Sequence, residues 1–351
     1  MKVDMPSGST HGWGVAGEYL EREIAKLPPI EGVTLHCMTS TLAPRNREAW
    51  NRINIGYCFF ENSVEILNYT RQAARTWDFI VAGSKWCEYQ LRIGGVQNTC
   101  TILQGIDPEN FYPAPLPPDD RFVVFSGGKF EFRKSQDIVI AAMKVFMERH
   151  RDAWLSCSWG NQWPFSVATM ASSPFISYRD DPENFLNTPE RTIIENGMDR
   201  SRVMVNPLIP NPEMRRIFAG THLGLFPNRC EGGNNMVMCE YMACGRAVIA
   251  SNTSGHADVI DDQGAYPLFS YRPMVVGGGG APVTSVWEEP SLEEVLVGLE
   301  WAYAHRDELP VKGAAAAQAM QKLSWSSAAR QFHYLAAKLA NQAEIARLRG
   351  A

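Results

Sequence analysis

The chain has 351 residues, of which 45% are hydrophobic and 20% are charged, the composition of an ordinary globular protein. This length exceeds the size at which a single hydrophobic core usually keeps growing, so we expect two domains. A formal net charge of -5 argues against a basic face that follows a phosphate backbone, and we expect no nucleic-acid partner. The eight cysteines include no C-x-x-C pair and are typical of reduced thiols.

The sequence contains no signal-peptide pattern and no stretch approaching the roughly 18 apolar residues that span a bilayer. We therefore expect a cytoplasmic protein. The segment 328–348 mixes apolar residues with Arg330, Lys338 and Arg347. This mixture favours an amphipathic helix that packs on the core, and it leaves open a peripheral contact with the inner membrane.

The first third of the chain alternates short β-rich runs with helical ones. We predict strands over 33–38, 53–60, 78–82 and 101–103, and helices over 14–26, 64–75 and 84–93. Such alternation is typical of a mostly parallel sheet with helices on both faces. Four prolines between 113 and 118 interrupt the pattern, because proline continues neither a helix nor a central strand. We place the N-terminal domain at 1–114 and a proline-rich linker at 115–120.

The same alternation of strands and helices returns after the linker. We predict strands over 122–125, 154–157, 203–205, 223–226 and 247–250, and helices over 135–149, 212–219, 235–244 and 292–304. The expected fold class is α/β, with two doubly wound, Rossmann-like domains, the second at 121–325. Ligands of such sheets bind beyond the carboxyl ends of the strands. The glycine run 277–280 is interpreted as a flexible surface loop.

A glycine turn with several basic residues follows the first strand of the second domain. Gly128 lets the backbone approach a ligand, while Lys129, Arg133 and Lys134 can stabilise a diphosphate as its charge grows on departure. The alternative, a turn with solvated basic residues, stays open on this segment alone.

Two glutamates flank the start of a later apolar helix. Glu231 follows a strand, and Glu240 lies among methionines, where a carboxylate needs a polar partner such as a ligand hydroxyl. Backbone amides at the start of this helix would face an anion. The expected donor-binding residues here are Gly232, Gly233, Asn234, Asn235 and Met236. The alternative gives Glu231 a role at the helix start and Glu240 a structural hydrogen bond.

The order of the basic turn (128–137), the two glutamates and the Met-Ala-Cys-Gly run at 242–245 resembles the C-terminal half of retaining glycosyltransferases of family 4, the glycosyltransferase group 1 proteins. Segments 77–84 and 102–113 extend the resemblance into the N-terminal domain. It implies the GT-B fold, in which two domains face each other across a cleft. It also implies that the last helix, 326–351, packs back on the N-terminal domain and that hinge closure excludes water.

Residue by residue, the resemblance implies that Lys129 and Lys134 take the places of the family's diphosphate-binding Arg and Lys. Glu231 would contact hydroxyls of the donor sugar, and Glu240 the ribose. One departure concerns spacing: the family has seven residues between its two glutamates, whereas positions 232–239 place eight here. Glu231 is therefore shifted by one position relative to the family pattern.

The N-terminal domain supplies further candidates. By position, Gly12 and Gly14 correspond to the family's glycine loop facing the donor phosphates, although a simple turn before a helix explains them as well. Glu61 follows the second predicted strand and is the candidate closest to the reacting carbon, with a helix-cap role as its alternative. His11 is a further candidate hydrogen-bond donor.

The resemblance implies a hexosyltransferase that moves a sugar from a UDP- or GDP-sugar to a glycan, lipid-linked or protein acceptor with retention. The catalytic candidates are Glu231, Lys134, Lys129 and Glu61. No two aspartates are separated by one residue, so a D-x-D metal clamp is absent, and we expect no metal or other cofactor. A nucleotide-sugar epimerase, a phosphorylase of the same fold, or a catalytically silent nucleotide-sugar-binding protein remains as an alternative.

Overall fold

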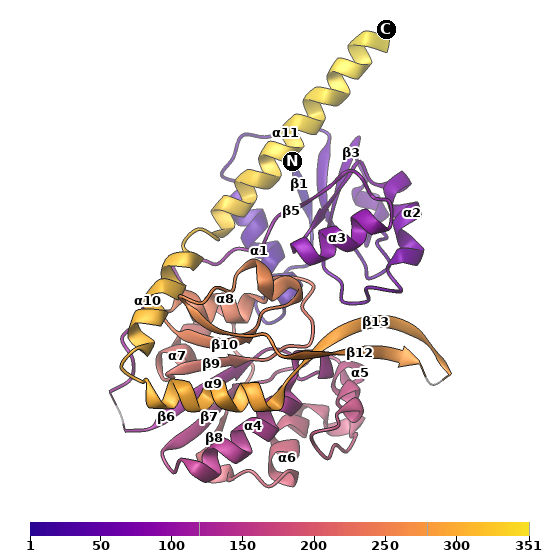
Figure 1. The fold of residues 1–351 in the computed structure, drawn as a ribbon. Helices are drawn as coiled ribbons and strands as arrows, with labels where there is room; N and C mark the ends of the chain where they lie inside the picture. The colour runs from indigo at the N-terminus through magenta and orange to yellow at the C-terminus, as the bar shows by residue number, and fades with distance from the viewer. Residues whose placement is uncertain (119, 279, 351) are drawn as a thin grey trace.

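The computed structural model describes residues 1–118, 120–278 and 280–350, and it contains two separate parallel sheets with helices packed against them (Figure 1). The proline-rich linker and the segment before the last helix both pass between these two domains. Asp119 of the predicted linker and Ala351 of the predicted last helix lie outside the described residues.

The N-terminal sheet has the strand order β1-β2-β3-β4-β5, and its strands are all parallel. The strands are β1 (Lys2–Asp4), β2 (Val33–Cys37), β3 (Ile53–Cys58), β4 (Phe79–Ala82) and β5 (Thr99–Thr101), and the helices are α1 (Gly12–Ile24), α2 (Leu67–Thr76) and α3 (Lys85–Ile93). Side chains alternate between the two faces of a strand. Val81 therefore packs with α1, whereas Ile80 and Ala82 pack with α2 and α3.

The C-terminal sheet has the order β11-β10-β9-β6-β7-β8, again all parallel. Its strands are β6 (Phe122–Gly127), β7 (Ala153–Ser158), β8 (Val203–Val205), β9 (Leu223–Phe226), β10 (Ala247–Ser251) and β11 (Ala265–Leu268). The chain leaves β6 in one direction along the sheet and returns to its other side at β9. This reversal is a topological switch point, where doubly wound sheets bind ligands.

Helices cover both faces of the C-terminal sheet. They are α4 (Gln136–Arg149), α5 (Pro164–Val167), α6 (Thr188–Glu195), α7 (Met214–Ala219), α8 (Met236–Ala243), α9 (Leu292–Ala304) and α10 (Leu309–Met320). Helices α4 and α9 share one apolar core, and α8 and α10 share the core on the opposite face. Short 3-10 turns lie at Arg47–Ala49, Phe132–Lys134, Ala168–Ser172, Pro182–Asn187, Arg200–Arg202, Asn211–Glu213 and Ser254–Asp258.

A two-stranded antiparallel hairpin, β12 (Tyr271–Gly278) and β13 (Ala281–Pro290), extends from the C-terminal domain (Figure 1). The prediction of a flexible loop at 277–280 is wrong for Gly277 and Gly278, which belong to β12, whereas Gly280 lies in a turn. Gly279 lies outside the described residues. The three described glycines, Gly277, Gly278 and Gly280, have positive φ of 86°, 89° and 108°, which fits the end of a tightly turning hairpin.

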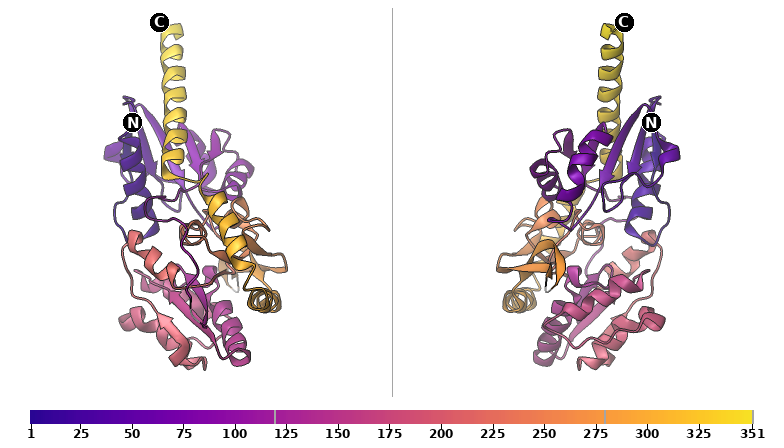
Figure 2. Two further views of the ribbon diagram at one scale, coloured as in Figure 1. Left: turned by 90° about the vertical axis from the view of Figure 1, so that its left-hand side faces the viewer. Right: turned by 90° about the vertical axis from the view of Figure 1, so that its right-hand side faces the viewer.

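The last helix, α11 (Trp325–Gly350), packs on the N-terminal domain. Trp325 stacks on Tyr19 of α1 with ring centroids 5.6 Å apart, and Phe332 contacts Tyr57 of β3. The C-terminal part of α11 continues beyond the N-terminal domain (Figure 2). Within the described part of the chain, we find no helix both long enough and apolar enough to traverse a bilayer.

Candidate active site

The two domains enclose a cleft of about 300 Å³ at the switch point of the C-terminal sheet. The N-terminal domain contributes the start of α1, with Gly12 and Trp13, together with Glu61 and Gln104. The other wall comes from the turn between β6 and α4 and from the start of α8. The structure thus brings candidates from both domains into one cavity.

The turn after β6 places the basic residues along the cleft. Gly128 has a φ of 118°, and a Cβ there would lie 3.0 Å from Cδ of Lys134, so glycine lets the turn fold tightly against this lysine. Lys134 is nearly buried, whereas Lys129 is more exposed, pairs with Glu131 at 3.2 Å and lies over the Trp163 ring. The two lysines of the turn therefore differ in accessibility within the cleft.

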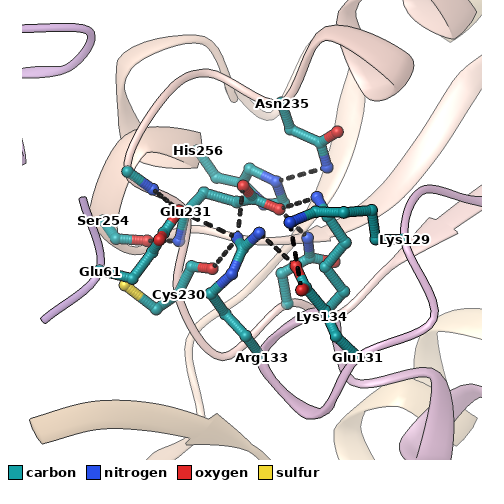
Figure 3. Close-up of polar contacts among 12 residues, drawn as sticks. Glu61, Lys129, Glu131, Arg133, Lys134, Cys230, Glu231, Asn235, Ser254 and His256 are labelled. Atoms are coloured by element: carbon teal, nitrogen blue, oxygen red, sulfur yellow. Dashed lines mark hydrogen bonds and ion pairs between the residues drawn. The ribbon is translucent and has the colours of Figure 1, made fainter. Parts of the chain in front are cut away.

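Glu231 lies opposite this turn, and its carboxylate faces Arg133 and Lys134 (Figure 3). Its oxygens accept from Lys134 at 2.5 Å, from Arg133 at 2.8 Å and from the side chain of Asn228. Burial alone would raise the pKa of Glu231, but the charges of Arg133 and Lys134 outweigh it and hold that pKa well below its ordinary value. Burial, in turn, lowers the pKa of Lys134 despite its partner Glu231.

Arg133 connects three carboxylates that come from three segments. Its guanidinium lies 2.8 Å from Glu231, 3.4 Å from Glu61 and 2.5 Å from Glu131. Burial would lower the pKa of Arg133, but these carboxylates raise it well above its ordinary value. Burial also opposes ionisation of Glu131, yet the charge of Arg133 brings its pKa to about 2. Arg133 therefore organises the cluster, and Glu131 is a member that the sequence did not indicate.

Glu61 reaches the cluster from the loop after β3. Its Oε1 accepts the backbone N–H of Gly232 at 3.3 Å, in addition to facing Arg133. Glu61 thus bridges the domains at the edge of the cleft, while its predicted catalytic role stays a prediction.

Glu240 is a buried acid on α8 that also lines the cleft. Burial raises its pKa to about 8, and a hydrogen bond from Asn211 at 2.7 Å opposes this only in part. At neutral pH the side chain of Glu240 is therefore mainly a protonated carboxylic acid, which can both donate and accept hydrogen bonds. Asn211 in turn accepts from the hydroxyl of Tyr19 at 3.0 Å, so α1 supports the same group.

The start of α8 offers backbone amides toward the cleft. Asn235, which precedes the helix, has a φ of 54° and bonds through its side chain to Nε2 of His256 at 3.0 Å. Nδ1 of His256 lies 3.2 Å from the Ser251 carbonyl. Burial lowers the pKa of His256 to about 4, so the imidazole is neutral and can accept from the Asn235 amide. This buried histidine was not among the predicted residues.

Three predicted donor-binding residues do not line the cleft, and packing explains their positions. A Cβ on Gly14, inside α1, would lie 2.5 Å from the Gly8 carbonyl oxygen, and one on Gly232 would lie 2.5 Å from that of Phe60. Asn234 is fully buried, where its side chain donates to the Gln104 carbonyl at 3.0 Å. These residues join segments of the structure, whereas the other predicted residues reach the cavity.

Several cleft residues carry no local sequence signal. Trp163, Asn161, Gln104 and Asn211 come from loops, and only the fold brings them together. Among residues 1–118, 120–278 and 280–350, no three His, Cys, Asp or Glu side chains are grouped as metal ligands.

The fold is shared with known glycosyltransferases of the GT-B class, which confirms the predicted fold class. Sucrose-phosphate synthase from Thermosynechococcus elongatus superposes with a TM-score of 0.64 at 19% identity, covering 88% of this chain and 73% of that one. A trehalose-6-phosphate synthase gives 0.64 at 14% identity, with coverages of 92% and 77%. Anabaena HepE in complex with UDP-glucose gives 0.59 at 14% identity, with coverages of 82% and 72%.

The sequence also matches the family model of glycosyl transferases group 1 over residues 181–272. This range includes Glu231 and Glu240 but not the basic turn. No curated protein sequence matches the chain. The family match and the fold together confirm the resemblance to group 1 glycosyltransferases and indicate a transferase enzyme.

Proposed function

We propose that this protein transfers a sugar from a nucleoside diphosphate to an acceptor hydroxyl, with retention at the anomeric carbon and without a metal ion. The observation that carries the proposal is one cleft that combines a cationic turn, an ionised Glu231 and a protonated Glu240. A nucleotide sugar presents a group for each of them: a diphosphate for the basic turn, sugar hydroxyls for Glu231 and, on the other side of the diphosphate, a ribose for Glu240.

The diphosphate binds between Lys129, Lys134 and the amides at the start of α8. Lys134 already forms an ion pair with Glu231 at the cavity wall, so the diphosphate of the nucleotide sugar competes with this carboxylate for the lysine. Glu240 meets the ribose hydroxyls, with which a protonated carboxyl exchanges hydrogen bonds in both directions. The solved complex of Anabaena HepE with UDP-glucose supports a nucleotide sugar as the ligand class.

The reaction exchanges one bond to the anomeric carbon for another. The acceptor oxygen bonds to that carbon on the face from which the diphosphate leaves, while the carbon–oxygen bond to the β-phosphate breaks. The bonding pair goes to the departing phosphate oxygen, which also takes the proton of the acceptor hydroxyl. Lys129 and Lys134 stabilise the growing charge, which is the role that a divalent cation has in metal-dependent transferases.

The remaining site residues hold the donor sugar and limit the access of water to it. Glu231 accepts hydrogen bonds from donor-sugar hydroxyls, and its shifted position in the sequence is compensated by Arg133 and Asn228, which orient the carboxylate. Trp13 and Phe59 form an apolar wall, with ring centroids 4.7 Å apart. A glycan, lipid-linked or protein hydroxyl is the proposed acceptor, with transfer in the cytoplasm or at the inner membrane surface.

The test is proton NMR of a UDP- or GDP-sugar incubated with the protein and EDTA, with water or a sugar as acceptor. Release or transfer of a sugar whose first-formed anomer matches the donor supports the proposal, and an inverted anomer contradicts retention. Conversion of the nucleotide sugar to its epimer supports an epimerase instead, and a requirement for phosphate supports a phosphorylase. A Lys134→Ala variant is expected to abolish the signal, whereas Lys322→Ala, at an exposed position that does not line the cleft, is expected to retain it.

A further inference from the structure

The hairpin β12–β13 has an inward and an outward face. Because side chains alternate along a strand, Ser285, Trp287 and Glu289 of β13 share one face. Ser285 and Glu289 are buried, whereas Val286, between them, is 44% exposed. The hairpin therefore presents polar groups to the rest of the molecule.

The inward face of β13 contacts the N-terminal domain at Glu61. The Ser285 hydroxyl and the Trp287 indole N–H both donate to the backbone carbonyl of Glu61, at 2.6 Å and 2.8 Å. The amides of Val64 and Glu65 donate to the Thr284 carbonyl at 3.1 Å and 3.0 Å. A segment of the C-terminal domain thus holds the loop from which the Glu61 carboxylate reaches the cleft.

The base of the hairpin is fixed by a buried ion cluster. Glu289 pairs with Arg229 at 3.0 Å, and Arg229 pairs with Asp137 at 2.8 Å, all three side chains being nearly or fully inaccessible. Arg229 also donates to the Phe132 carbonyl at 2.7 Å, and its backbone N–H donates to the Arg133 carbonyl at 2.9 Å. One guanidinium therefore fixes both β13 and the basic turn of the active site.

We propose that Ser285 and Trp287 are positioning residues for Glu61, and that the hairpin sets the place of this carboxylate relative to Arg133 and the basic turn. The proposal rests on the proposed function and on the catalytic role predicted for Glu61. Glu61 Oε1 lies 3.3 Å from the Gly232 amide and 3.4 Å from Arg133, while its backbone carbonyl is held by Ser285 and Trp287. Without these two hydrogen-bond donors, the backbone of Glu61 would be held less firmly, and its carboxylate would shift relative to Arg133.

The kinetic test is a double-mutant cycle. The double variant Ser285→Ala, Trp287→Phe removes both donors to the Glu61 carbonyl and keeps most of the packing. We expect it to lower kcat by about tenfold or more, with the donor KM changed by less than about twofold, because misplacement of a catalytic group acts on the chemical step. In a Glu61→Gln background, the same two substitutions should change kcat by less than about twofold. An equal loss in both backgrounds, or no loss, would overturn the proposal.

A second measurement needs no turnover. Hydrogen–deuterium exchange of a peptide covering 61–67 should accelerate in the double variant, because the Ser63 amide loses its acceptor, the Ser285 hydroxyl at 3.2 Å, and the loop loses two further bonds to β13. The control Val286→Thr, on the outward face, should leave this exchange and kcat unchanged. Unaltered exchange in the double variant would overturn the positioning role. Failure of the wild-type protein to turn over any donor would contradict the proposed function, while the exchange result would still decide whether the hairpin holds this loop.

Discussion

Nζ of Lys134 lies 2.5 Å from Oε1 of Glu231, so the residue expected at the donor diphosphate and the residue expected at the donor sugar form one ion pair. The pair is buried within the cleft wall and is supported by Arg133 on the carboxylate side. A diphosphate that binds Lys134 must share it with this carboxylate. Binding of the diphosphate by Lys134 and binding of the sugar by Glu231 are therefore linked, and a substitution of one partner measures each role separately.

Replacement of Glu231 by Gln should separate binding from catalysis. The amide keeps the shape of the side chain but releases Lys134, so the affinity for free UDP or GDP should stay equal or increase. The rate of transfer should fall by about 10²-fold, because a charged acceptor for the sugar hydroxyls is lost. Calorimetry of the nucleoside diphosphate and kcat for transfer measure the two effects. A large loss of nucleotide affinity would contradict the assigned role.

Gly128→Ala should weaken donor binding more than its cost in stability explains. The φ of 118° strains any other residue, and the new Cβ would approach Lys134. Gly95→Ala is the matched control, because its φ is 92° and a Cβ there meets nothing within 4 Å. Both variants should lose about 1–3 kcal/mol of stability, measured by urea unfolding. Only Gly128→Ala should lose nucleotide affinity; equal affinity in the two variants would contradict this account of the turn.

Glu240 gives the protein a specific pH dependence of stability. Its pKa is raised to about 8 in the folded state from an ordinary value near 4.5, so the folded protein holds a proton that the unfolded chain releases. This contribution is fully present below about pH 4.5 and is lost as the pH rises through about 8, at up to about 1.4 kcal/mol per pH unit.

The isosteric Glu240→Gln variant should lack this dependence. Its free energy of unfolding, measured with urea between pH 6.5 and 8.5, should fall less steeply with pH than that of the wild type. Parallel slopes for the two proteins would show that the Glu240 carboxyl is already ionised at neutral pH.

The buried cluster around Arg229 should be essential for stability. Arg229→Met leaves Asp137 and Glu289 buried without their shared cation, which costs about 3–5 kcal/mol. Arg272→Met removes another partner of Glu289, but Arg272 is 69% exposed, so the expected loss is below about 1 kcal/mol. Chemical denaturation of the two variants measures the difference, and similar losses would argue against the cluster as the anchor of the hairpin.

Most of the regular elements could be predicted because their apolar periodicity is local. Strands β8 and β9 and helix α9 have the predicted bounds, and β2, β3 and α4 differ only at their ends. Helix α2 begins at Leu67 rather than 64, because the amides of Val64 and Glu65 bond to Thr284 of the distant hairpin. A tertiary contact of this kind leaves no mark in the local pattern.

One missed element, the hairpin, has a different cause. The hairpin β12–β13 was hidden by its glycines, which resemble a loop when the pairing of Val276 with Ser285 is unknown. In the site, Lys134, Glu231 and Glu240 could be found because they belong to short motifs. Asn211, Glu131 and His256 could not, because their roles depend on partners that only the fold supplies.

The most direct test of the central claim is calorimetric titration of the protein with UDP- and GDP-sugars, with and without EDTA, repeated with Lys134→Ala. The account predicts micromolar binding of one nucleotide sugar that survives EDTA and is weakened at least tenfold by the substitution. Binding that requires a divalent cation, or that is unchanged in Lys134→Ala, would contradict a metal-free donor site built on the basic turn.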